Sequence, residues 1–169
     1  PDVYRHNAFR ISGLPVTATP RQIKRRLDDM QAAKDWGDSA TSRSAQAFSL
    51  DGHLSLEAIR AATQRLLDPQ SRLVDEFFWF WPYAWEAGGD DSALAPLATG
   101  AQEQAYAIWR AAEDASDPYI RVVAAHNLAV MFHLLALDAE QTSLDSDLSP
   151  QQLATIAGHW RDAFSRWQL

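Results

Sequence analysis

The stretch DPQSRLVDEFFWFWP, residues 68–82, decides the fold that we predict for this chain. It begins as a helix, because Asp68 can accept a hydrogen bond from an amide of the first turn and Pro69 needs no donor at the first helical position. The aromatic residues that follow are the densest in the chain. The stretch therefore closes one helical unit and leads into a second.

The apolar residues of this stretch predict a short, buried helix. Leu73, Phe77 and Phe80 recur at i, i+4 and i+7, which places them on one helical stripe. The other aromatic residues lie off that stripe, so the helix is apolar nearly all round. We expect it to be buried between two helical units.

The same helix-start pattern occurs four times, and it favours an all-α protein. In each case a side chain that can cap a helix precedes a proline at the first helical position. Two of these pairs are followed three residues on by a glutamine, the spacing of a capping box. Runs of alternating Val, Ile and Thr are missing, as are Asn-Gly hairpins. The four pairs are Thr19 with Pro20, Asp68 with Pro69, Asp117 with Pro118, and Ser149 with Pro150.

The hydrophobic periodicity predicts where these helices lie and which residues they bury. Helices are expected over residues 7–11, 20–34, 55–67, from 69 onward, 102–116, 118–137 and 150–167. The residues expected to face inward are Ile23, Leu27 and Met30; Leu56, Ile59, Ala62, Thr63 and Leu66; Ala105, Ile108, Trp109 and Ala112; Val123, Asn127, Leu128, Met131 and Leu135; and Leu153, Ile156, Trp160, Phe164 and Trp167. Short connections between the last three helices favour antiparallel neighbours.

Glycine and charge patterns divide the chain. Gly88 and Gly89 form the clearest hinge signal. We therefore predict a helical unit over 1–81, a linker over 82–100, and a helical hairpin with a packing helix over 101–169. Residues 1–43 hold eight Lys and Arg against five Asp and Glu, whereas the net charge of the whole chain is −7.

Composition limits the partners and the compartment. An acidic chain lacks the broad basic surface that nucleic-acid binding needs, so no nucleic acid is expected. We find no uninterrupted apolar run of roughly 18 residues and no signal-peptide pattern, so no membrane partner is expected. The absence of cysteine excludes disulfides and thiolate metal sites and favours a cytoplasmic protein.

Three blocks of the first half occur in the order and spacing of a known family. They are Phe9, Arg10, Ile11, Ser12, Gly13 and Leu14; Ala18, Thr19, Ile23 and Lys24; and Ile59, Ala62, Leu66, Asp68, Pro69 and Arg72. In these blocks the chain resembles a J-domain, the helical module of co-chaperones that stimulate the major ATP-driven heat-shock chaperone. The resemblance implies an antiparallel pair of helices, about 20–34 against 55–67.

The same resemblance implies a basic, chaperone-facing patch at Arg21, Lys24 and Arg25. A solvated helix face with i, i+4 pairs to Asp28 and Asp29 is the alternative. The family's His-Pro-Asp tripeptide follows its second helix and stimulates the chaperone ATPase. Residues 31–51 contain neither histidine nor proline, so the resemblance does not extend to that activity.

Fragments of the second half are similar to tetratricopeptide helices. They are Ala105, Tyr106, Trp109 and Ala112 in one helix, and His126, Asn127, Leu128 and Ala129 in the next. No second copy follows at about 34 residues, and one repeat cannot bury its own face. We therefore expect a helical hairpin rather than an array.

Signals for catalysis, cofactors or metals are missing. His126 and His133 lie seven residues apart, too far to share one ion, and His133 is expected to be a partly buried, hydrogen-bonded side chain. No nucleophile elbow and no phosphate-binding loop occur. We predict no cofactor and no metal site, and an enzyme is the less favoured class.

The aromatic segment after residue 78 completes the set of candidates. We expect Trp79 and Phe80 to be structural, and at least one of Trp81, Tyr83 and Trp85 to be exposed and to anchor a protein partner. The preferred function is a non-catalytic interaction protein or co-chaperone-like adaptor, with self-association left open. The alternative is an enzyme, or an enzyme's helical regulatory domain, whose site follows no recognisable motif.

Overall fold

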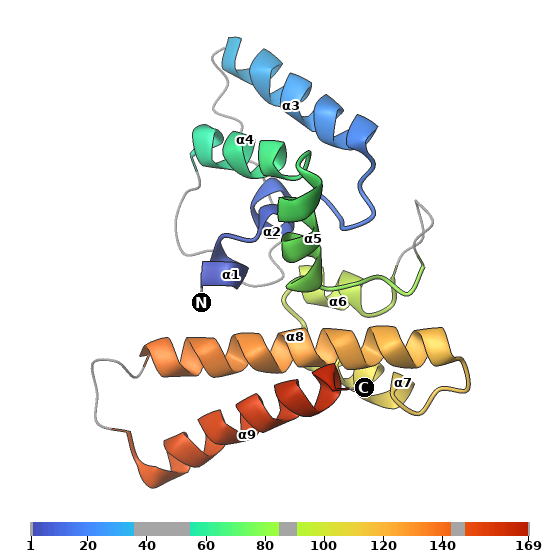
Figure 1. The fold of residues 1–169 in the computed structure, drawn as a ribbon, viewed down its shortest axis with the longest axis vertical. Helices are drawn as coiled ribbons and strands as arrows, with labels where there is room; N and C mark the ends of the chain where they lie inside the picture. The colour runs from blue at the N-terminus through green and yellow to red at the C-terminus, as the bar shows by residue number, and fades with distance from the viewer. Residues whose placement is uncertain (1, 36–54, 85–90, 143–147, 169) are drawn as a thin grey trace.

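The computed structural model describes residues 2–35, 55–84, 91–142 and 148–168, and Figure 1 labels their helices. Across these ranges the structure is all-α with no strand, which confirms the predicted fold class. The helices are α1 (Asp2–Arg5), α2 (Ala8–Ser12), α3 (Pro20–Asp35), α4 (Leu56–Arg65), α5 (Pro69–Phe77), α6 (Leu94–Ala98), α7 (Gln102–Ala112), α8 (Pro118–Thr142) and α9 (Pro150–Trp167).

The short helix α2 is fixed at both ends by local contacts. The Asn7 side chain accepts hydrogen bonds from the amides of Phe9 and Arg10 at the first turn. Gly13 ends the helix with a φ of 69°, a left-handed conformation that glycine adopts without strain. This places Phe9 and Ile11 in the centre of the first core.

The first core lies between α2, α3 and α4. Ile23 and Met30 of α3 are buried against it, as are Ile59, Ala62 and Leu66 of α4. The helices α3 and α4 pack together and run in opposite directions (Figure 1), as expected. One face of α3 is thus used for packing, and the other faces outward.

The Arg72 guanidinium of α5 fixes the connection that leads into α3. It donates to the carbonyls of Ala18 and Val16 at 2.9 and 2.8 Å, and it lies 5.8 Å from the centre of the Phe9 ring. These contacts satisfy carbonyl oxygens of a loop that has few other partners. Arg72 therefore holds the loop that precedes α3 against α5.

The expectation of a fully buried, aromatic helix from residue 69 is wrong. The helix α5 ends at Phe77, so Phe80 is not on it, and Leu73 and Phe77 are exposed. Its buried residue is Asp75, whose carboxylate accepts from the Ala8 amide at 3.1 Å and from Arg65 at 2.6 Å. The polar partners of Asp75 therefore set the orientation of α5, and its apolar residues Leu73 and Phe77 face solvent.

The second core surrounds α8, which lies between α9 and the helices of the first half (Figure 1). A window of α8 has a mean hydropathy of 1.7, which by length and composition would suit a membrane span. However, 67% of that window is buried within the fold. We therefore interpret α8 as the core helix of the second half, because such helices are apolar all round.

The helix α9 packs on α8 through part of the predicted stripe, with Ala163 facing inward in place of Phe164. Ile156 and Ala163 are buried, and Trp160 and Trp167 are half-buried. Leu153 and Phe164, which were expected to face inward, are exposed. The buried set follows i, i+4, i+7 and i+11, and the small Ala163 allows the two helices to approach closely.

The two cores are joined in ways that the predicted division does not include. Tyr4 of α1 belongs to the second core, although it lies in the first unit by sequence. The helix α6 falls inside the range predicted as linker. The hinge residues Gly88 and Gly89 themselves lie outside the described residues.

Truncation of Trp109 tests the second core. This side chain is fully buried and stacks on Phe80 with ring centres 5.3 Å apart. We expect Trp109→Ala to lower the free energy of unfolding by about 3–5 kcal/mol, because the cavity cannot collapse. Urea unfolding measures this loss. The exposed control Leu153→Ala should change the midpoint little, and equal losses in both variants would contradict this description of the core.

Candidate functional site

The first candidate site is the outward face of α3. Arg21, Lys24 and Arg25 are exposed there at i, i+3 and i+4. A capping box fixes the start of the helix: the Thr19 amide donates to Oε1 of Gln22 at 2.7 Å, and the Gln22 amide donates to Oγ1 of Thr19 at 3.3 Å. The helix therefore presents the three cations as a defined array. We call these three residues the cationic face.

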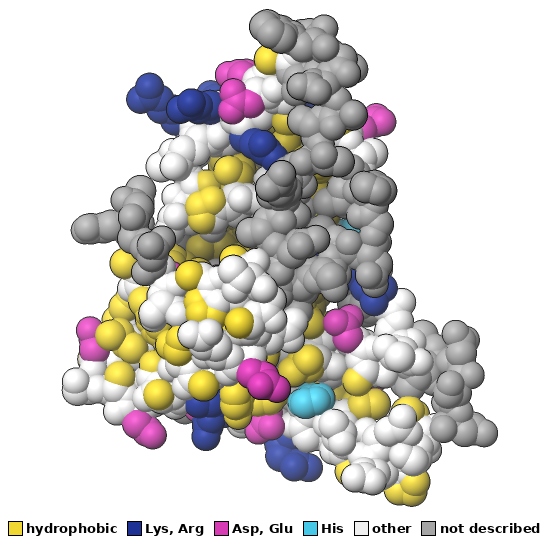
Figure 2. Space-filling model, turned by 180° about the vertical axis from the view of Figure 1, so that it is seen from behind, with side chains coloured by type: hydrophobic (Ala, Val, Ile, Leu, Met, Phe, Trp, Pro, Cys, Tyr) yellow, Lys and Arg dark blue, Asp and Glu magenta, His cyan; other side chains and the backbone are white. Residues whose placement is uncertain are grey.

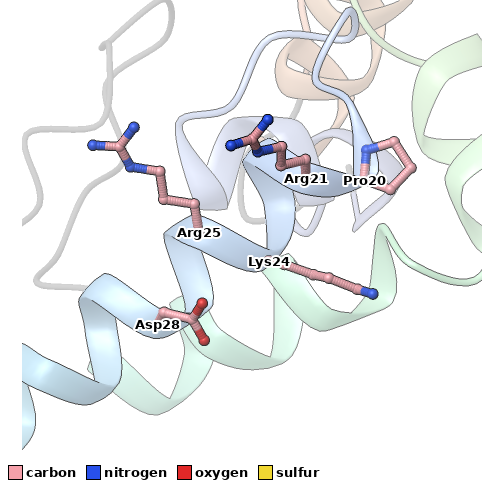
Figure 3. A pocket seen from close by; sticks show the side chains of 5 residues that line it. All are labelled: Pro20, Arg21, Lys24, Arg25 and Asp28. Carbon is pink, nitrogen blue, oxygen red and sulfur yellow. The ribbon is translucent and has the colours of Figure 1, made fainter.

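The cationic face lines a shallow hollow of about 450 Å³ together with Pro20 and Asp28. In Figure 3, Arg21 and Arg25 extend to the same side of the helix, and Lys24 extends to another. Figure 2 shows Lys and Arg side chains gathered at this end of the molecule, with acidic side chains beside them.

The expected ion pairs along α3 are not formed. Within the described residues, no ion pair joins Lys24 to Asp28 or Arg25 to Asp29. Such pairs contribute only a few tenths of a kcal/mol, so solvation of separate long side chains competes with them. The cations can therefore bind an external anion without first breaking an internal pair.

The second candidate site is the aromatic segment, which α8 binds through its backbone. The Trp81 amide donates to Oδ1 of Asn127 at 2.7 Å, and Nδ2 of Asn127 donates to the Trp81 carbonyl at 2.8 Å. Asn127 is fully buried, so these two bonds satisfy a side chain that could not otherwise be placed there. Asparagine within an apolar helix was the sequence signal of this contact.

His126 supports the same segment. Its Nε2 lies 3.1 Å from the Trp79 carbonyl, and because a carbonyl only accepts, Nε2 carries the proton. The imidazole stacks on the Trp81 ring with centres 3.7 Å apart. Burial lowers the pKa of His126 to about 4, and the bond to Trp79 only partly opposes that effect.

The structure describes two of the three aromatic residues of which at least one was expected to be exposed, Trp81 and Tyr83, so that expectation stays a prediction. Both are half-buried, and the Trp81 indole Nε1 donates to the Glu76 carbonyl at 2.9 Å. The Tyr83 amide donates to the Asp91 carboxylate at 2.7 Å. Burial, with a smaller contribution from the Asp91 charge, raises the pKa of the Tyr83 hydroxyl to about 12. Trp85 lies outside the described residues.

The structural role expected for Trp79 and Phe80 is confirmed. Phe80 is buried and stacks on Trp109, and Trp79 packs against both cores. Pro82 disfavours helix at the residue before it, and residues 79–84 are not helical, so Phe80 can insert between helices. Trp79 and Phe80 therefore connect the two cores.

His133 also matches its expected environment. Its Nδ1 lies 2.8 Å from the Tyr4 hydroxyl, and the ring is half-buried against Trp160 and Trp167. Burial lowers the pKa of His133 and raises that of Tyr4. This pair joins α1 to the second core, so the residue is structural in its contacts.

Two other hollows offer polar rather than reactive groups. One, of about 310 Å³, lies between α3 and α4 and contains Glu57 and Arg60. The other, of about 510 Å³, lies between α8 and α9 and contains the amide and hydroxyl side chains of Thr142, Gln151 and Thr155. In the part of the chain that the structure describes, no three His, Cys, Asp or Glu side chains are grouped to hold a metal ion.

Comparisons with protein families, with curated proteins and with solved structures give no significant match.

The depressed pKa of His126 predicts an acid-sensitive stability. The unfolded chain takes up this proton near pH 6.5 and the folded chain only near pH 4, so stability falls as the pH drops through that window. The loss is about 3 kcal/mol at most, from 1.36 kcal/mol per pKa unit. We expect His126→Gln to flatten the dependence in urea unfolding measured from pH 4 to 7.

The lowered pKa of His133 also makes the free energy of unfolding fall as the pH drops, and the raised pKa of Asp75 has the opposite effect. The contribution of His126 is therefore the difference between the pH dependence of the unmodified chain and that of His126→Gln. His6→Gln is the matched control, because His6 is exposed. If the stability of His126→Gln depends on pH as strongly as that of the unmodified chain, another group causes the acid sensitivity.

Proposed function

We propose that this chain is a non-catalytic, co-chaperone-like adaptor that binds an acidic surface of a protein partner through its cationic face. The observation that carries this proposal is the array of Arg21, Lys24 and Arg25, exposed on α3 and without an ion pair to Asp28 or Asp29. Adjacent cations on one rigid element favour a partner with clustered carboxylates.

The way α3 is held favours binding at low entropic cost. Ile23 and Met30 are buried on the opposite side of the helix, and Arg72 fixes the loop before it. The helix axis is therefore set before any partner arrives, and only the side chains of the cationic face must be ordered on binding. A preformed array of this kind suits a docking surface.

The charge distribution favours one orientation of the partner. The first 43 residues carry a net positive charge, while the rest of the chain holds 17 Asp and Glu against seven Lys and Arg. An acidic partner is attracted to α3 and repelled by the remaining surface, which steers encounter toward the cationic face. Binding should weaken as salt is added.

The resemblance to J-domains supports an ATP-driven heat-shock chaperone as the partner. In that family the corresponding basic helix contacts the chaperone, and the His-Pro-Asp tripeptide stimulates its ATPase. This chain has the basic residues but no histidine or proline in residues 31–51. We therefore propose binding without stimulation, as expected of an adaptor or a competitor of active co-chaperones.

Charge reversal tests the binding step. We expect Lys24→Glu combined with Arg25→Glu to weaken binding to the purified chaperone by about tenfold or more, because attraction becomes repulsion. Fluorescence anisotropy at two salt concentrations measures the affinity. Arg60→Glu is the matched control, since it makes the same kind of charge change at an exposed position on α4. Equal affinities of the double variant and the unmodified chain would exclude the cationic face.

The ATPase itself gives a separate prediction. We expect no acceleration of single-turnover ATP hydrolysis by the chaperone when the intact chain is added, because the stimulating tripeptide is missing from residues 31–51. An active J-domain protein in the same assay is the positive control. Clear acceleration by this chain would contradict the proposed mode of action.

A further inference from the structure

A second, apolar surface lies where α5, α8 and α9 meet. Its exposed members are Leu73, Val74 and Phe77 of α5, Val122 of α8 and Phe164 of α9, and we call it the α5–α9 face. Their exposed fractions are 69% for Leu73, 52% for Val74, 43% for Phe77, 59% for Val122 and 51% for Phe164. Scattered apolar residues are normal on a surface, but a contiguous set marks an interface.

Ring contacts link Phe77 and Phe164, and helical spacing links the other members to them. Phe77 stacks on Trp167 with ring centres 5.8 Å apart and an interplanar angle of 25°. Phe164 lies 6.4 Å from the same Trp167 ring, so α5 and α9 form one surface. Phe77 also meets the His126 ring at 5.9 Å, and Val122 lies one helical turn before His126.

The α5–α9 face is preformed. Asp75 anchors α5 through Arg65, and Arg166 anchors the end of α9 through a 2.7 Å ion pair with Glu113 of the α7 C-cap. Figure 1 shows the C-terminal end of α9 beside α8, below the lower end of α5. Because these elements are fixed within the fold, little backbone entropy is lost when the face is covered.

The size of the face matches one half of an ordinary protein interface. Five large side chains that each expose about half of their area present on the order of 400 Å² of apolar surface. A standard interface buries roughly 800 Å² on each partner, of which rather more than half is apolar. The face therefore supplies nearly the whole apolar share that a stable dimer needs.

The charges around the face are of both signs, and several pair within the chain. On α5 Arg72 lies 3.6 Å from Glu76, and on α9 Asp162 lies 3.6 Å from Arg166. This balanced rim offers no cluster of one sign to a strongly acidic or basic partner, whereas a two-fold related copy presents an apolar patch of the same size with an equally balanced rim. We propose that the α5–α9 face binds the same face of a second copy of this chain and forms a two-fold symmetric dimer.

This dimer does not depend on the adaptor proposal, because the cationic face of α3 takes no part in it. We expect the intact chain to show a monomer–dimer equilibrium with a dissociation constant in the micromolar range by sedimentation equilibrium. The double variant Leu73→Lys and Val74→Lys should weaken dimerisation by about tenfold or more, since it places four charges in one interface. Both residues are largely exposed, so the melting temperature of the dilute monomer should be unchanged.

Leu153→Lys is the matched control, because Leu153 is equally exposed near the other end of α9. It should leave the dimer intact. An intact chain that stays monomeric at about 200 µM would overturn the proposal, as would a double variant that dimerises like the unmodified chain. Binding of a different protein to this face of a chain that stays monomeric would overturn it as well.

A second measurement avoids charged variants altogether. The chain has no cysteine, so Leu73→Cys introduces a single attachment point for a nitroxide spin label. In a two-fold dimer the two labels lie across one interface, and we expect dipolar broadening that is lost on dilution with unlabelled chain. A spectrum that does not change on this dilution would exclude the α5–α9 face.

Discussion

The two hydrogen bonds between the Asn127 amide and the backbone of Trp81 hold the two cores in one arrangement. Asn127 lies on the buried side of α8, where an unpaired amide would cost about 1–3 kcal/mol for each polar group left unsatisfied. The non-helical segment around Trp81 must therefore lie against α8 in one register. That register places Phe80 against Trp109 and places the Trp79 carbonyl at His126.

The two proposed surfaces result from how the fold uses its polar residues. The buried carboxylate of Asp75 binds the Ala8 amide and Arg65, so the side of α5 that carries Asp75 faces the protein interior. Leu73 and Phe77, on another side of the helix, are exposed. The helix α3 uses its apolar face on α4, which leaves its cations in solvent. One surface is thus apolar with mixed charges at its rim, and the other is cationic, so they select different partners.

Local chemistry made much of this fold predictable. The caps at Asn7 and Ser149 and the stripe that includes Ile23 and Met30 depend on residues within one or two turns, so the sequence alone indicates them. The cationic face follows from the same spacing. The burial of Asp75 could not be read in this way, because its partner Ala8 lies 67 residues away. An analysis of hydrophobic periodicity assigns any Asp to the solvent-exposed side of a helix, even where its carboxylate is buried.

The contact between Tyr4 and His133 joins residues that are 129 positions apart. During synthesis the N-terminal end leaves the ribosome well before α8 is made, so Tyr4 cannot be buried in the second core until α8 has been synthesised. The same applies to Phe80, because the Trp109 ring on which it stacks is synthesised later. The first core can form early from α2, α3 and α4, but its aromatic extension stays uncovered until translation has passed α8. Nascent chains of this protein therefore expose aromatic surface for a longer time than its compact native state suggests.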